Sequence, residues 1–351
     1  MRDRIQAVSH FVHAHFLWLL IGSYAVAAVV PGPGLGIRSL SFGAVAVAGQ
    51  RTTLTLPVVL LAFLIFNAGL GVRSSELRGL VRAPLPLALG LAANLLVPVA
   101  FIFAVAQTMQ LWHNADEVQN ILVGLALVAS MPIAGSSTAW AQNANGDLAL
   151  SLGLVLLSTL FSPLTTPVAL HAVGWMAAGE YAENLHSLAT GETGSFLVVS
   201  VVMPCIAGLV VRQVAGGARV EAVRPALRLL NTAALLVLNY ANAAVSLPQA
   251  IAHPDWDFLA AILVVVIGLC TLAFASGAVV GWATGTGPTR RASLMFGLGM
   301  NNNGTGLVLA SMALADHPDV LLPIIFYNLF QHLAAGCVDY LLSRSAPEET
   351  V

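Results

Sequence analysis

The stretch 257–282 contains one charged residue, Asp257, and is otherwise a continuous run of apolar and small residues. A helix needs about 20 apolar residues to cross the hydrocarbon of a bilayer, so this run is long enough to span one. Similar runs recur along the chain, and 58% of the 351 residues are hydrophobic while 9% are charged. A soluble protein of this length could not keep so many apolar residues away from water. The sequence therefore predicts an integral membrane protein.

Polar or Pro- and Gly-rich breaks separate ten such runs, and each run is predicted to form one transmembrane helix. The runs cover residues 15–32, 54–72, 84–107, 119–145, 148–172, 195–212, 228–246, 257–282, 291–315 and 320–342. The predicted fold is an all-α membrane protein with ten transmembrane helices. The first run, which follows Arg2 and Arg4, also fits a signal peptide, but a matching run at 196–211 opens the second half and favours a transmembrane helix.

An acidic loop at 174–194 divides the ten runs into two groups of five. The predicted organisation is a first repeat at 1–173 (helices 1–5), an external linker at 174–194, a second repeat at 195–344 (helices 6–10) and a cytoplasmic tail at 345–351. Because each repeat has an odd number of helices, the two repeats are inverted relative to each other. Inverted repeats are typical of secondary transporters.

The placement of arginine predicts the orientation in the membrane. When the loops are assigned alternately to the two sides, only Arg38 and Arg51 of the 14 basic residues fall on the side opposite the others. Short cytoplasmic loops carry the excess of positive charge, so both termini are predicted to be cytoplasmic. The expected location is the inner (plasma) membrane of a bacterium.

Two of the ten runs are interrupted at corresponding places. The fourth contains PIAGSST at 132–138 and the ninth contains GLGMNNNG at 297–304. Proline removes a backbone donor and glycine permits an unwound backbone, so helices 4 and 9 are predicted to be broken. The half-helix after each break presents unpaired N–H groups and partial positive charge, which favour an anion. In the alternative interpretation, these small and polar residues only allow close helix packing.

Residues at and near these breaks are the predicted substrate-binding residues. His332 joins them because it is the one titratable side chain deep in a predicted span, where it either pairs with an anion and carries protons or, when neutral, bonds between helices. Asn239 and Asn242 either face the cavity or bond between helices. The predicted substrate-binding set is Gly135, Ser136, Ser137, Thr138, Asn302, Asn303 and His332.

The two interrupted regions resemble those of the bile acid:sodium symporter family. The similarity lies in GSSTAWAQNANGDLALSLGLVLLSTLFSPLTTP at 135–167, in GLGMNNNGTGLVLASMAL at 297–314 and in PIIFYNLFQHLAAG at 323–336. The resemblance implies two inverted five-helix repeats with crossing helices 4 and 9. It also implies a core domain of helices 3–5 and 8–10, a panel domain of the other four helices, and a substrate cavity between the domains.

The same resemblance implies a set of sodium ligands, and this chain departs from the family pattern at five of them. Asn94 and Asn301 stand where Gln is common, and Thr138 stands where Asn is common. Gly297 stands where the family usually has Glu, and Val155 stands where it often has Thr. The loss of the carboxylate removes the only formal negative charge near the ions, so we predict weak or absent sodium dependence. Coupling to sodium, to protons or to neither is left open. The implied ligand positions are Asn94, Ser137, Thr138, Ser151, Val155, Gly297, Met300 and Asn301.

The predicted function is secondary transport of a small organic anion by alternating access, with no enzymatic activity, no cofactor and no metal other than sodium. A non-transporting receptor or an intramembrane enzyme on the same fold is the alternative. An antiporter of cations and protons would need intramembrane acids, and the sequence places none near either break. The expected partners are the lipid bilayer and the anionic substrate but not nucleic acid, and the oligomeric state is left open.

Overall fold

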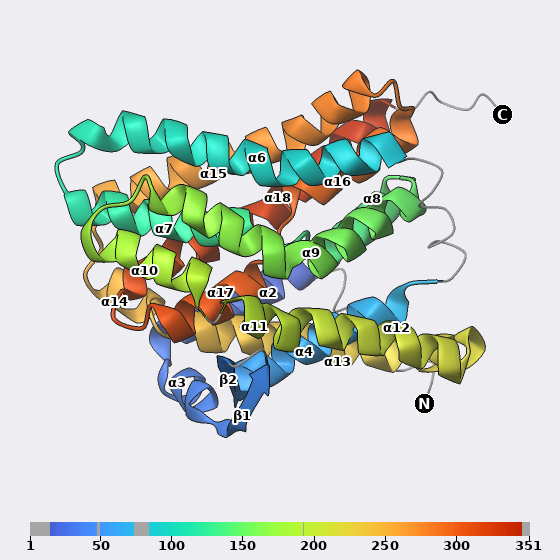
Figure 1. Cartoon of the computed structure of the whole chain (residues 1–351), viewed down its shortest axis with the longest axis horizontal. Helices are drawn as coiled ribbons and strands as arrows, with labels where there is room; N and C mark the ends of the chain where they lie inside the picture. The colour runs from blue at the N-terminus through green and yellow to red at the C-terminus, as the bar shows by residue number, and fades with distance from the viewer. Residues whose placement is uncertain (1–14, 48–49, 74–83, 192, 346–351) are drawn as a thin grey trace.

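The computed structural model describes residues 15–47, 50–73, 84–191 and 193–345, and within these the chain is mostly helical (Figure 1). The α-helices are α2 (Phe16–Val29), α3 (Gly32–Ser39), α4 (Leu56–Gly71), α6 (Pro84–Thr108), α7 (Ala115–Ser130), α8 (Ser136–Asn143), α9 (Leu148–Gly174), α10 (Gly179–Thr190), α11 (Thr193–Leu197), α12 (Met203–Ala215), α13 (Gly217–Ala243), α14 (Leu247–Ala252), α15 (Trp256–Ala283), α16 (Pro288–Gly299), α17 (Asn303–Ala313) and α18 (Leu321–Ser345). Short turns of other helix types are η2 (Met109–Leu111), η3 (Val198–Val202) and η4 (Pro318–Val320).

Five of the described helical segments are long and apolar enough to cross a membrane. A sixth is counted if α2 and α3, which meet at a bend of 95°, form one span. α4 is apolar but shorter, and α7, α8, α16 and α17 are halves of broken segments. These findings support an integral membrane protein, while the count of ten spans remains a prediction. The five segments are Pro84–Leu111, Leu148–Gly174, Thr193–Ala215, Trp256–Ala283 and Pro318–Arg344.

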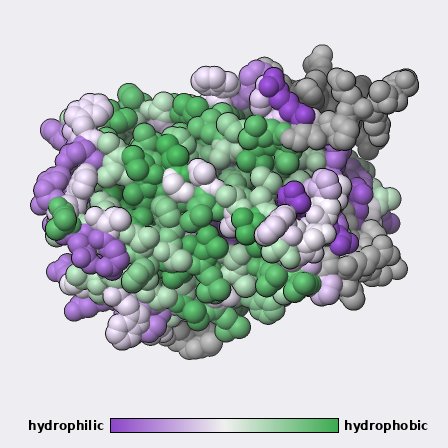
Figure 2. Space-filling view, turned by 90° about the horizontal axis from the view of Figure 1, so that it is seen from above, coloured by the Kyte–Doolittle hydropathy of each residue, from purple (hydrophilic) through white to green (hydrophobic). Residues whose placement is uncertain are grey.

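The molecular surface has the polarity that a bilayer requires. Figure 2 shows a broad hydrophobic band across one face, with hydrophilic residues gathered at both ends of the long axis. Large apolar side chains are exposed along whole helices, including Leu96 and Phe103 of α6 and Val264 and Val279 of α15. Exposed apolar surface of this extent is stable against lipid but not against water.

The helices form two groups that lie one above the other in Figure 1. We call α6–α9 and α15–α18 the large group, and α2–α4, α12 and α13 the small group. Glycines let backbones touch within each group: an added Cβ at Gly208 of α12 would collide with Phe66 of α4, and one at Gly277 of α15 would collide with Leu294 of α16. Small residues at such contacts are the usual means of packing helices in membranes.

The structure contains one element that the all-α prediction did not include. Strands β1 (Ser41–Val47) and β2 (Gln50–Thr55) pair as an antiparallel hairpin between α3 and α4. The hairpin lies mostly between the first two predicted spans and overlaps the start of the second. β-branched residues such as Thr52 and Thr53 favour extended backbone there. The predicted external linker also differs from a plain loop, because α10 occupies most of it.

Candidate functional site

The two breaks predicted from the sequence are present, and they meet in space. α7 and α8 are separated at 131–135, and α16 and α17 are separated at 300–302. Ile133 and Asn301 form an antiparallel bridge. The Ala134 N–H donates to the Met300 carbonyl at 2.9 Å, and the Asn302 N–H donates to the Pro132 carbonyl at 2.8 Å. Each break thus provides hydrogen-bond partners for backbone groups of the other break that have none within their own helix. Burial in a membrane requires such pairing.

Side chains from the two following long helices complete this crossing. The Ile133 N–H donates to Ser158 Oγ of α9 at 3.0 Å, and the Asn301 N–H donates to Gln331 Oε1 of α18 at 3.0 Å. The same arrangement therefore occurs in both halves of the chain. A backbone N–H in each break donates to a polar side chain of the next long helix, which is α9 in the first half and α18 in the second. Neither Ser158 nor Gln331 was predicted from the sequence. The available signal was a polar residue within an apolar span, some 25 to 30 residues after the residue it bonds in each break.

The half-helix ends at the crossing differ in exposure. Gly135 and Ser136, at the start of α8, are exposed. Asn303 and Thr305, at the start of α17, are fully buried, and Asn302 caps this helix by accepting from the Thr305 N–H at 3.3 Å. The start of α8 is accordingly open to a solute, whereas the start of α17 is covered.

Several buried polar side chains at the start of α17 and at the end of α13 have no hydrogen-bond partner among the described residues. Both amide atoms of Asn303 and of Asn242 lack hydrogen-bond partners among the described residues, as do Thr305 Oγ1 and Ser246 Oγ. Leu238 of α13 lies 3.6 Å from the position that a Cβ on Gly304 would take, so α13 lies directly against this part of α17. Buried polar groups are normally hydrogen-bonded. The unpaired donors and acceptors on these side chains could therefore form further hydrogen bonds.

A chain of hydrogen bonds connects the crossing to the small group. Gln331 Nε2 donates to Asn328 Oδ1 at 3.3 Å, and Asn328 Nδ2 donates to Tyr24 Oη at 2.7 Å. Asn328 Nδ2 also lies 3.4 Å from Asn239 Oδ1. Asn239 therefore bonds between helices, one of the two roles that the sequence left open for it. The network links α18 with α2 and α13.

His332 points elsewhere than its neighbour Gln331. It is half-buried, and its ring meets that of Phe16 edge to face, with centroids 5.3 Å apart. Within the described residues, no hydrogen bond joins His332 to either break. The proposed role of His332 at the substrate therefore stays a prediction, while its observed contact is with α2.

The implied sodium ligands that carry side-chain oxygens are all neutral. Asn94 Oδ1, Ser137 Oγ and Asn301 Oδ1 are buried without partners among the described residues, and Ser151 Oγ donates to Thr138 Oγ1 at 3.1 Å. The Met300 carbonyl is already used by Ala134. Unpaired buried oxygens suit a hard cation, so the donor types fit sodium.

The position of the missing carboxylate is apolar. A Cβ on Gly297 would lie 2.9 Å from Leu154 Cδ1, and Leu154 is fully buried. Val155 packs against the same apolar cluster, whose buried members are Leu87, Ile133, Leu150, Leu154, Leu294 and Leu298. Leu154 thus lies where a side chain at position 297 would begin.

Comparison with known proteins agrees with this arrangement. A family model described as the Sodium Bile acid symporter family matches residues 58–252, more than half of the chain. The chain belongs to the sodium bile acid symporter family. This confirms the resemblance inferred from the sequence, and it identifies the protein as an integral membrane protein of a transporter family. The matched region includes the first break.

Two relatives come from Bacillus subtilis (strain 168). The chain is 26% identical over 291 residues to the protein called "Uncharacterized protein YbaS". The aligned residues make up 81% of this chain and 87% of the relative. It is 27% identical over 156 residues to the protein called "Uncharacterized sodium-dependent transporter YocS", which covers 44% of each chain.

Proposed function

We propose that this chain is a secondary transporter that moves a small organic anion across a bacterial plasma membrane by alternating access. The observation that carries the proposal is the antiparallel crossing of the two breaks, which brings the starts of α8 and α17 to one place. Two half-helix ends with partial positive charge favour an anionic solute there. The membership of a transporter family supports transport over catalysis.

The small group acts as a panel and the large group as a core in this proposal, within a ten-helix inverted repeat. The similar bonds from Ile133 to Ser158 and from Asn301 to Gln331 support the internal symmetry. Alternating access then consists of rocking one group against the other around the fixed crossing.

In this proposal the described state is open on the side of α8, where Gly135 and Ser136 are exposed. On the opposite side, Arg38 Nη2 of α3 donates to the Ser311 carbonyl of α17 at 2.7 Å, which ties the small group to the large one. In the predicted topology the open side is cytoplasmic. The unpaired amides of Asn242 and Asn303 would be freed for water or substrate when this second side opens.

Uptake into proteoliposomes tests the proposal. Vesicles containing the purified chain should accumulate a small carboxylate above the level of protein-free vesicles. A thermal-shift screen of organic anions selects the compounds, because a ligand that binds the folded state raises its apparent stability. Saturable binding without flux would identify a receptor instead, and conversion of the compound would identify an enzyme.

The predicted topology has its own test at Glu183, an exposed residue of α10. We expect Glu183→Cys, in a background without Cys205, Cys270 and Cys337, to react with an impermeant thiol reagent added outside intact cells. Protection at this position until the membrane is permeabilised would contradict the external placement of 174–194. A cysteine at Gly287, predicted to be cytoplasmic, is the matched control and should behave in the opposite way.

A further inference from the structure

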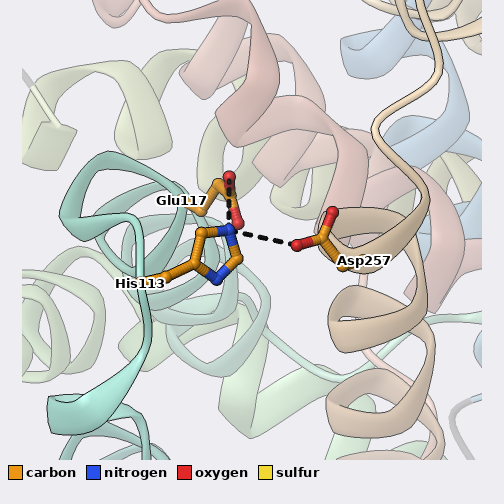
Figure 3. A group of neighbouring side chains, drawn as sticks. All are labelled: His113, Glu117 and Asp257. Carbon is orange, nitrogen blue, oxygen red and sulfur yellow. Dashed lines mark ion pairs between the residues drawn. The ribbon is translucent and has the colours of Figure 1, made fainter.

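Three side chains with metal-ligating groups gather at an end of the molecule that the crossing does not involve (Figure 3). His113 precedes α7, Glu117 lies in its first turn, and Asp257 lies in the first turn of α15. His113 Nε2 is 3.1 Å from Asp257 Oδ2 and 4.0 Å from Glu117 Oε1. One ligand atom from each residue lies within 4.8 Å of the other two.

Glu117 is held in place as a metal ligand would be. Its side chain is only 8% exposed, which is rare for a carboxylate, and it faces His113. Trp112 Nε1 donates to Glu117 Oε2 at 2.7 Å, and Asn114 Nδ2 donates to Glu117 Oε1 at 2.6 Å. Hydrogen bonds of this kind orient the ligands of metal sites and fix their geometry.

The charge at this corner is unbalanced. In the described part of the chain, Glu117 and Asp257 form ion pairs with His113 alone, and Asp116 and Asp255 add two more carboxylates nearby. His113 can supply at most one positive charge against these four carboxylates. A buried carboxylate such as Glu117 needs a stronger partner.

An approach from solvent exists beside the cluster. A shallow surface hollow of about 580 Å³ is lined by residues 252–257, which include Asp255 and Asp257. His113 and Asp257 are themselves 62% and 55% exposed. An ion can therefore reach the three side chains without any opening of the fold, and water or Asp255 can complete its coordination.

We propose that His113, Glu117 and Asp257 bind a divalent transition-metal ion of the zinc type. The mixed nitrogen and oxygen donors match zinc, whereas calcium and magnesium prefer oxygen ligands alone. Zinc lies about 2.0–2.2 Å from such ligands, so a pair already 3.1 Å apart can share one ion. The ion would fasten the start of α7 to the start of α15. This site is independent of the transport proposal.

The test uses the full-length, tag-free protein in detergent with Cys337→Ser, because Cys337 is the exposed thiol among the three free cysteines. We expect one zinc ion to bind saturably and to raise the melting temperature. Cobalt bound in its place should give the visible absorption of a low-coordinate site with nitrogen and oxygen ligands. Magnesium and calcium should not compete at equal concentration.

Variants distinguish this site from adventitious binding. His113→Ala and Asp257→Asn should lose the binding and the cobalt spectrum. Trp112→Phe keeps all three ligands and should weaken binding by about 10- to 100-fold, since it removes an orienting hydrogen bond. The control His317→Ala removes a histidine from a pair with Glu180 at 4.0 Å and should change nothing. Absence of saturable zinc binding, or unchanged binding in His113→Ala, would overturn the proposal.

Discussion

The variant Ser136→Trp should reduce anion uptake to the level of protein-free vesicles while the protein still folds. Ser136 is the first residue of α8 and is exposed, so an indole fits there without disturbing the packed interior. It would cover this half-helix end and occupy the space in front of the crossing. Uptake of a labelled carboxylate measures the loss, and the melting temperature reports the fold.

Gln142→Trp provides the matched control. Gln142 is also exposed and lies near the other end of α8, away from the crossing. An equal bulk at this position should leave uptake close to that of the unmodified chain. Normal uptake by Ser136→Trp would place the substrate elsewhere, and equal loss in both variants would show that bulk on α8 disturbs the protein generally.

The second large effect concerns sodium, which should stimulate uptake weakly or not at all. The neutral oxygens of Asn94, Ser137 and Asn301 remain, and neutral oxygens can hold a monovalent ion in a protein. A lost bond to a charged group costs about 1.5–3 kcal/mol. Two missing ligands, at Gly297 and Val155, therefore raise the sodium dissociation constant by on the order of a hundredfold or more.

Restoring the carboxylate should create a sodium response. Gly297→Glu places its Cβ 2.9 Å from Leu154 Cδ1, so the side chain of Leu154 has to move. The double variant Gly297→Glu, Leu154→Ala provides the space and should show the larger gain in sodium-stimulated uptake. Such a core truncation costs about 2–5 kcal/mol, so the melting temperature is measured alongside.

Gly297→Gln with Leu154→Ala is the control for that experiment, because it has the same shape without the charge. It should respond to sodium no more than the unmodified chain does. An equal response in the glutamine and glutamate variants would show that space, and not charge, limits sodium binding at this position.

The sequence predicted both breaks because proline, glycine and asparagine are poor residues for the middle of a membrane helix. It did not predict which groups would satisfy the exposed backbone. Pairing of Ile133 with Asn301, and the contribution of Gln331, depend on how distant helices pack. Helices that are apolar on all sides have no amphipathic pattern from which packing can be deduced.

Sequence patterns did not predict other features of the structure, for similar reasons. The hairpin of β1 and β2 is short and lies next to an apolar helix, so its residues were read as part of a connection and the start of a span. His113 and Asp257 lie far apart in the chain, and only the packing of α7 beside α15 brings them together. The resemblance showed that position 297 lacks a carboxylate. It did not show that the side chain of Leu154 lies next to Gly297.

Anion transport with weak sodium dependence is tested most directly by uptake into proteoliposomes. A sodium gradient, a potassium gradient or a pH gradient is imposed separately. We predict carboxylate uptake that Ser136→Trp abolishes and that a sodium gradient alone hardly changes. Stimulation by the pH gradient would assign coupling to protons, and equal uptake under all three gradients would indicate facilitated diffusion. Steep stimulation by sodium alone would contradict weak sodium dependence, and no carboxylate flux under any gradient would contradict transport of a small organic anion.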